Sequence, residues 1–221
     1  MLIAQDGANG SKKELKYMTE DKKKLLLIFV KNPVLGKVKT RLAKDIGDEK
    51  ALQIYHRLLE HTFDIAKQLE VDIRVCYSGE PEPFDVFNHE NFEKVKQKGE
   101  DLGDKMANAF QDAFNDDYKE VIIIGSDCFE LKTAVLKDAF RTLGRFEVVM
   151  GPAFDGGYYL LGLKSFIPEL FVNKHWSTET VLHDTLEDLN QMNIAYDLLP
   201  GLSDVDELSD LPLSIREEFG I

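Results

Sequence analysis

Cysteine is scarce in this chain, and its positions exclude the roles that cysteines most often play. The 221 residues contain two, Cys76 and Cys128, which lie far apart and form no C-x-x-C motif. A structural zinc site needs about four ligands, so a zinc centre built from cysteines is disfavoured. Two separated thiols are typical of a protein from a reducing compartment, and we expect free thiols and a cytoplasmic location.

Long hydrophobic runs are also missing. No apolar stretch approaches the roughly 20 residues of a membrane span, and residues 1–10 lack the basic region and apolar core of a signal peptide. Positive charge is in deficit, with 27 basic against 40 acidic residues and a net charge of −13. This balance disfavours a broad nucleic-acid-binding surface and docking on anionic membranes. We therefore expect small-molecule partners, with no nucleic acid and no membrane span.

Several familiar catalytic signatures are absent. The sequence has no G-x-G-x-x-G, no Walker A motif and no G-x-S-x-G, which disfavours a dinucleotide oxidoreductase, a P-loop ATPase and a serine hydrolase of that type. The five histidines show neither H-x-H nor H-E-x-x-H spacing. We interpret them as structural or exposed residues.

The chain does contain a regular alternation of strand-like and helix-like segments. Hydrophobic periodicity predicts strands at 24–30, 71–77, 92–97, 120–125, 146–150, 158–163 and 194–199. It predicts helices at 48–70, 101–114, 133–143 and 178–191, followed by an acidic, irregular tail over 201–221. Such alternation is typical of an α/β fold with a mostly parallel sheet covered on both faces.

The domain organisation is simple. Residues 1–22 are polar and precede the first predicted strand, so we interpret them as a flexible N-terminal extension, with Met18 as a plausible alternative start. No repeat, low-complexity block or linker follows residue 24. We expect residues 23–221 to form a single domain, whose oligomeric state the sequence does not give.

A basic loop follows the first predicted strand. Lys37, Lys39 and Arg41 place three cations within five residues of an otherwise acidic chain. Ligands of open α/β sheets bind at the carboxyl ends of strands, and arginine and lysine are suited to phosphate oxygens. The pattern indicates a phosphate or pyrophosphate site, although a solvated basic loop would look the same.

Two acidic motifs could bind a divalent cation. Asp127 follows the buried strand at 120–125, where a carboxylate can hold Mg²⁺ or Mn²⁺ on phosphate oxygens. It could instead cap the next helix or turn. Asp204 and Asp206 lie on one side of an extended segment and could complete the metal site, or belong to a solvated tail.

A third motif joins the strands at 146–150 and 158–163. Asp155, Gly156, Gly157 and Tyr158 form a tight-turn signal. If the motif is functional, its glycines let the backbone approach a substrate that Asp155 and Tyr158 face. The alternative is a plain turn that only joins the two strands. Trp176 could likewise stack on a sugar or base, or fill the core.

Taken in order, these motifs resemble one family. The resemblance covers about residues 24–210 and rests on Lys31–Leu42, Asp101–Met106, Ile124–Cys128, Gly151–Leu160, Trp176–Thr178 and Asp204–Asp206. The chain is identified as a member of the DUF2064 family, also called the radical-SAM/selenodomain-associated transferase 1 family. Its Lys39–Leu42 element is also similar to that of guanylyltransferases acting on phospholactate.

The resemblance implies a Rossmann-like, GT-A three-layer sandwich that binds a nucleotide diphosphate, often with Mg²⁺ or Mn²⁺. Carried over by position, Gly36, Lys39 and Arg41 would contact nucleotide phosphates. Asp127 would ligate the metal, and Asp155 would face the donor or acceptor together with Tyr158.

The chain departs from the family pattern at two positions. Lys105 stands where arginine is usual, which weakens a claim of bidentate recognition there but still supplies a charge for phosphate. Phe129 stands where proline is usual, which alters the turn after Asp127.

We therefore expect a transferase with a nucleotide-activated donor, first of all a glycosyltransferase using a nucleotide diphospho-sugar and a divalent metal. Asp155 would serve as the base that deprotonates an acceptor hydroxyl. One alternative is a nucleotidyltransferase that joins a nucleoside triphosphate to a phosphorylated acceptor and releases pyrophosphate. Another is a nucleotide-binding regulator without turnover.

Removing residues 1–22 should leave the melting temperature and nucleotide binding unchanged, because polar termini outside the first strand rarely carry fold energy. Thermal melts and calorimetric titrations of the full chain and the truncated chain provide the comparison. A loss of several degrees would mean that the segment packs on the domain.

Overall fold

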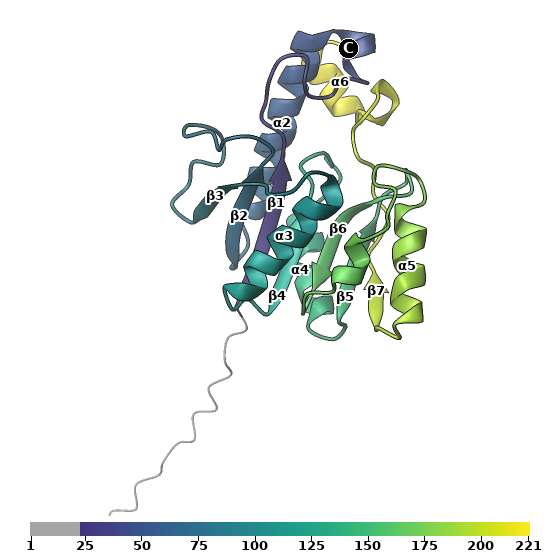
Figure 1. Cartoon of the computed structure of the whole chain (residues 1–221). Helices are drawn as coiled ribbons and strands as arrows, with labels where there is room; N and C mark the ends of the chain where they lie inside the picture. The colour runs from purple at the N-terminus through teal and green to yellow at the C-terminus, as the bar shows by residue number, and fades with distance from the viewer. Residues whose placement is uncertain (1–22) are drawn as a thin grey trace, which may run out of the picture.

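The computed structural model describes residues 23–221, so the expectation for residues 1–22 lies outside the described residues. Seven strands form one sheet with helices on both faces (Figure 1). The strands are β1 (Lys24–Val30), β2 (Asp72–Tyr77), β3 (Phe92–Lys96), β4 (Glu120–Ile124), β5 (Val148–Pro152), β6 (Tyr158–Leu163) and β7 (Tyr196–Leu198). The helices are α1 (Ala43–Ile46), α2 (Asp48–Ala66), α3 (Leu102–Asn115), α4 (Thr133–Leu143), α5 (Val181–Gln191) and α6 (Leu213–Phe219), with 3₁₀ turns η1 (Pro168–Phe171) and η2 (Leu208–Asp210).

The sheet order determines which loops meet. The strands lie in the order β3-β2-β1-β4-β6-β5-β7, and all neighbours are parallel except β6, which is antiparallel to β4 and β5. Ile28 of β1 pairs with Ile124 of β4, and Ile124 pairs with Leu160 of β6. The ends of β1 and β4 and the start of β6 therefore share one edge of the sheet, which confirms the mostly parallel α/β fold.

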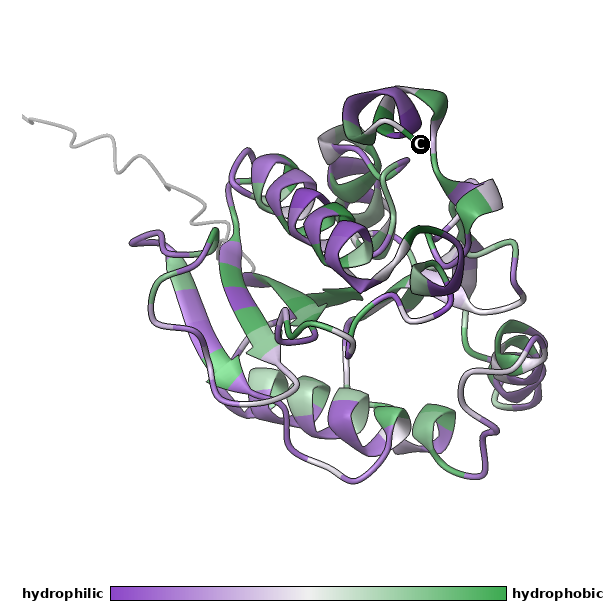
Figure 2. Cartoon of the chain, turned by 90° about the horizontal axis from the view of Figure 1, so that it is seen from above, coloured by the Kyte–Doolittle hydropathy of each residue, from purple (hydrophilic) through white to green (hydrophobic). Residues whose placement is uncertain are grey.

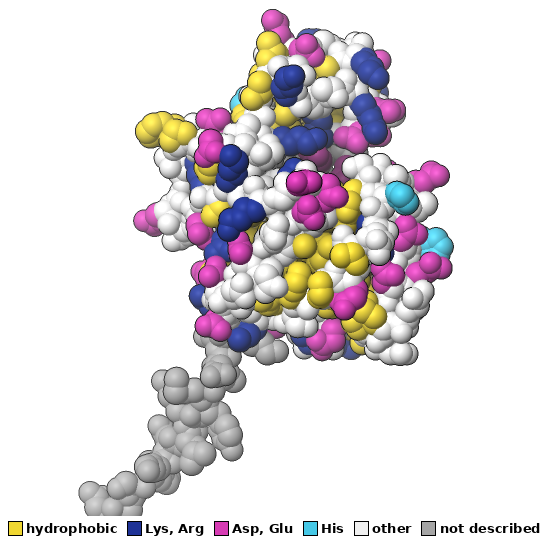
Figure 3. Space-filling model, in the orientation of Figure 1, with side chains coloured by type: hydrophobic (Ala, Val, Ile, Leu, Met, Phe, Trp, Pro, Cys, Tyr) yellow, Lys and Arg dark blue, Asp and Glu magenta, His cyan; other side chains and the backbone are white. Residues whose placement is uncertain are grey.

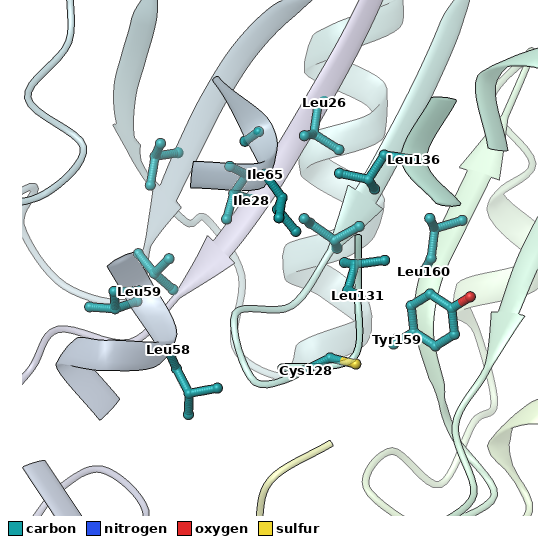
Figure 4. Packing of buried hydrophobic residues seen from close by; sticks show 14 of the residues in the cluster. Leu26, Ile28, Leu58, Leu59, Ile65, Cys128, Leu131, Leu136, Tyr159 and Leu160 are labelled. Carbon is teal, nitrogen blue, oxygen red and sulfur yellow. The ribbon is translucent and has the colours of Figure 1, made fainter. Parts of the chain in front are cut away.

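Alternating side chains of β1 supply both halves of the core. Leu26, Ile28 and Val30 pack in a cluster with α2 and α4, of which Figure 4 shows a part. Leu25 and Leu27 pack on the opposite face, in a cluster with α3 and α5. Strands buried on both faces lack a polar side, and Figure 2 shows the central strands in green between the helical layers, whereas the strands at one side of the sheet are partly purple. These layers make the three-layer sandwich.

The expectation of an irregular tail over 201–221 is wrong. Residues Leu213–Phe219 form α6, and Ile215 is 6% exposed within the cluster of α2 and α4. A seven-residue helix with one buried side chain produces too little periodicity to stand out from its acidic surroundings. The tertiary contact of Ile215 therefore decides the structure of this segment.

Ile215→Ala should lower the free energy of unfolding by about 2–4 kcal/mol, since truncating a buried isoleucine removes apolar contact and leaves a cavity. Leu213→Ala on the same helix is the matched control, because Leu213 is 75% exposed. Denaturant unfolding of both variants measures the difference. Equal losses would show that α6 does not contribute to the core.

Candidate functional site

A cavity of about 480 Å³ opens where the ends of β1 and β4 meet the start of β6. Seven side chains that the sequence motifs indicated belong to its lining: Arg41, Asp127, Asp155, Tyr158, Trp176, Asp204 and Asp206. Gly157 also lines it, whereas Gly36, Lys37, Lys39, Gly156 and Lys105 are not part of the lining. The basic loop, Asp127, the Asp155–Tyr158 turn, Trp176 and the Asp204/Asp206 segment are far apart in sequence and meet at one cavity.

We call the part of the cavity lined by Arg41, Asp127, Asp155, Asp204 and Asp206 the polar end, and Lys39 lies beneath its surface. Its ammonium group lies 2.8 Å from Asp127 Oδ1 and 3.6 Å from Asp206 Oδ1, and donates to the carbonyl oxygen of Val205 at 2.7 Å. The side chain is 4% exposed. Its backbone has φ = 49°, in the left-handed region that costs a non-glycine residue about 1–3 kcal/mol. The ion pairs and hydrogen bond hold the loop in this conformation.

The other cations of the basic loop are exposed. Arg41 is 66% exposed, and its guanidinium group lies 3.5 Å from Asp206 Oδ2. Lys37 is exposed, and Gly36 takes a left-handed φ of 70° that suits the turn of the loop. Lys105 is half-buried on α3. Phosphate binding by these residues stays a prediction.

Four carboxylates gather at the polar end, from Asp127, Asp155, Asp204 and Asp206. Burial and the negative charges of Asp127, Asp155 and Asp206 raise the pKa of Asp204 to about 7, against the opposing effect of Lys39. The middle residue of the Asp204–Asp206 segment anchors it to the core. Val205 is buried, and its N–H donates to the carbonyl oxygen of Asp127 at 2.8 Å. This end of the cavity therefore has an excess of negative charge.

Tyr55 positions the polar end from within the core, a role that the sequence did not indicate. Its hydroxyl donates to the carbonyl oxygen of Lys31 and accepts from the Lys31 N–H, both at 2.9 Å. It also lies 3.4 Å from Ser126 Oγ, next to Asp127. Burial raises the pKa of Tyr55. In the sequence Tyr55 is one apolar position of an amphipathic helix, so no local signal identifies its role.

The Asp155–Tyr158 segment is both a turn and a wall of the cavity. Asp155 Oδ1 accepts from the Gly157 N–H at 2.9 Å, which closes the turn between β5 and β6. Gly156 has φ = 90°, and a Cβ there would lie 2.1 Å from the carbonyl oxygen of Glu179. Glycine is therefore required for the turn to pack against the segment before α5.

The aromatic side chains of the cavity contact α3 and the core. The indole of Trp176 covers the first turn of α3, where a Cβ on Gly103 would meet its Nε1 at 2.2 Å. Tyr158 lines the cavity with its ring, while its hydroxyl is buried without a partner among the described residues. Trp176 is thus partly a packing residue, and stacking on a substrate stays a prediction.

Binding of a divalent cation by this site stays a prediction, and the described residues favour one that arrives together with a phosphate ligand. Within residues 23–221, no group of three or more histidine, cysteine or acidic side chains is arranged to hold a metal alone. Mg²⁺ is often held by one or two carboxylates plus substrate phosphates and waters. Asp127 and Asp206 fit that role, since the Lys39 ammonium group already lies between them as a cation.

A larger groove, of about 710 Å³, lies between β3 and α3. Its charged side chains are already paired: Arg74 lies 2.5 Å from Glu93 and 2.8 Å from Asp116, and Lys98 lies 2.8 Å from Asp112. It therefore offers no unpaired charge to a phosphate. Among the described residues, no helix has the length and apolar character needed to cross a membrane.

The fold and the site define an α/β protein of the GT-A type, with a candidate nucleotide site at the carboxyl ends of β1 and β4. The chain belongs to the family described as "Uncharacterized protein conserved in bacteria (DUF2064)", whose model matches residues 61–178. This membership confirms the resemblance found in the sequence.

Three known proteins match most of the chain. A crystal structure from Desulfovibrio desulfuricans G20, described as a "putative nucleotide-diphospho-sugar transferase", has a TM-score of 0.79 and 32% identity, and the match covers 87% of this chain and 90% of that one. The 2-phospho-L-lactate guanylyltransferase of Methanocaldococcus jannaschii is 29% identical over 78% of this chain and 73% of its own length. The inositol-1-phosphate CTP transferase of T. maritima shares the fold, with a TM-score of 0.56, 13% identity and coverage of 90% and 96%.

Asp204→Asn should change how stability depends on pH. Because the folded pKa of Asp204 is raised to about 7, the folded state keeps a proton that the unfolded state has lost above about pH 4. Asp204 therefore makes stability fall from about pH 4 to pH 7, and the asparagine variant should show a shallower fall. Urea unfolding at pH 4.5, 6 and 8 provides the curve. Parallel curves for variant and parent would contradict the assignment.

Proposed function

We propose that this protein is a nucleotidyltransferase, which joins the nucleotide of a nucleoside triphosphate to a phosphorylated acceptor and releases pyrophosphate. The observation that carries the proposal is the meeting of the basic loop with Asp127 and Asp206 at the strand ends. A guanylyltransferase that is 29% identical over 78% of the chain supports nucleotidyl transfer over sugar transfer. The glycosyl reaction favoured by the motifs thus gives way to the alternative.

The reaction needs positioning and charge neutralisation. An oxygen of the acceptor phosphate attacks the α-phosphorus and forms a new P–O bond. The bond between the α-phosphorus and its bridging oxygen breaks, and pyrophosphate leaves with the electron pair. A phosphomonoester is largely a dianion at neutral pH, so no base has to remove a proton. Asp155 would then not act as a base; its carboxylate would hold the turn between β5 and β6 in place through its hydrogen bond from the Gly157 N–H.

Lys39 and Arg41 would stabilise the negative charge that develops on the leaving pyrophosphate. Asp127 and Asp206 would hold a Mg²⁺ or Mn²⁺ ion, which supplies charge neutralisation on the phosphates when bound. Lys39 would then exchange carboxylate oxygens for phosphate oxygens. Such an exchange leaves every buried charge paired, which matters because an unpaired buried ion is costly.

Sugar transfer stays a second candidate, since the structure from Desulfovibrio desulfuricans G20, 32% identical, is described as a nucleotide-diphospho-sugar transferase. The two reactions release different products. Incubating the protein with nucleoside triphosphates, nucleotide sugars, Mn²⁺ and mixed phosphorylated acceptors should give pyrophosphate and no nucleoside diphosphate. Nucleoside diphosphate as the product would support sugar transfer, and binding without any product would support a regulator.

Arg41→Ala should weaken nucleotide binding by about tenfold or more, because a hydrogen bond to a charged group contributes about 1.5–3 kcal/mol. Lys44→Ala is the charge-matched control, since Lys44 is an exposed cation on α1 outside the cavity lining. Calorimetric titration with a nucleoside triphosphate and Mn²⁺ measures both. An equal loss of nucleotide affinity in the two variants would show that only the net charge of the protein matters. No loss of affinity in Arg41→Ala would exclude Arg41 from the site.

A further inference from the structure

The cavity has two chemically different ends. The polar end carries the four carboxylates and Arg41, whereas the rest of the wall includes apolar and aromatic side chains: Phe29, Leu102, Met106, Ile123, Tyr158 and Trp176. Figure 3 shows hydrophobic side chains gathered between α3 and α5, beside a group of acidic ones. We call the part lined by these six residues the apolar end.

The apolar end and the basic loop belong to opposite faces of the sheet. Val38 and Leu42 anchor the loop in the core cluster of α2 and α4. Met106, Ile123 and Trp176 belong to or pack on the cluster of α3 and α5. Asp127 follows β4, Asp155 lies in the turn between β5 and β6, and Asp206 is joined to Asp127 through Lys39, so the carboxylates line the cavity together with both the loop residue Arg41 and the apolar end. A nucleotide whose phosphates lie on the loop therefore meets the apolar end across the carboxylates, where its reaction partner has to be.

We propose that the apolar end binds the acceptor, and that the acceptor is a phosphomonoester with an extended apolar body. This inference rests on the proposed nucleotidyl transfer. A three-carbon polar acid such as phospholactate would leave the apolar wall uncovered. Burying that wall against carbon stabilises the complex by about 25 cal/mol per Å², so an apolar body gains affinity that a small polar acid cannot.

Two of the polar side chains around the apolar end, Tyr158 and Thr178, offer no free donor to a nucleobase edge. Tyr158 presents its ring, and its hydroxyl is buried. Thr178, on the wall before α5, already donates its hydroxyl to the carbonyl oxygen of His175 at 2.7 Å. A base carries several donors and acceptors whose burial without partners is costly. An alkyl or aryl body carries none, and fits this wall without such a cost.

The test uses a series of acceptors, from ethyl to butyl to hexyl phosphate, with nucleoside triphosphates and Mn²⁺. Pyrophosphate release should show kcat/KM rising by about threefold to fourfold per methylene, as expected for burial of carbon. Leu102→Gln should flatten this rise through the acceptor KM, since Leu102 is 41% exposed at the cavity and its replacement leaves the core intact. Leu198→Gln on β7, 42% exposed and outside the lining, should keep it.

The outcomes separate this inference from the proposed function. Pyrophosphate release with equal kcat/KM across the series would overturn the apolar acceptor and leave nucleotidyl transfer in place. A higher KM for the triphosphate in Leu102→Gln would place the nucleobase in the apolar end. This result would also overturn the proposal that the apolar end binds the acceptor. If no acceptor reacts, nucleotidyl transfer fails. Calorimetry then shows whether the apolar end binds an apolar phosphomonoester at all: tighter binding of hexyl than ethyl phosphate, lost in Leu102→Gln, supports that binding site, and equal binding overturns it.

Discussion

One buried ammonium group connects the parts of this site. Lys39 is paired with Asp127 and Asp206 and donates to the carbonyl oxygen of Val205. These contacts tie together the loop after β1, the loop after β4 and the segment before η2. A buried lysine is stable only when it is paired, so the three segments depend on each other. The left-handed backbone at Lys39 is held by the same contacts.

In the proposed function, a phosphate would bind at the polar end by replacing carboxylate oxygens as the partners of Lys39. Its acids are too many for Lys39 and Arg41 to neutralise, and the raised pKa of Asp204 reflects this excess. A site with surplus carboxylates repels a bare phosphate and accepts a phosphate that arrives with a cation. In the proposed function, charge balance would link metal, nucleotide and Lys39 in one binding event.

The rest of the cavity depends on packing. Gly103 accepts the indole of Trp176, and Gly156 lets the β5–β6 turn contact the segment before α5. In both places a side chain would collide with its neighbour. The cavity therefore keeps its shape through close backbone approach, while the chemistry of its wall sets what can enter.

The sequence by itself determined the strand and helix alternation, because periodicity reports which side chains are buried, and it indicated Arg41, Asp127 and Asp155 through local motifs. It did not predict α6, since one buried residue, Ile215, leaves no periodic signal. Only the tertiary structure decided that Lys39 pairs with two carboxylates and that Tyr55 supports Lys31, because those partners lie far away in the chain. Sheet order brought them together, and no local pattern encodes a contact that depends on it.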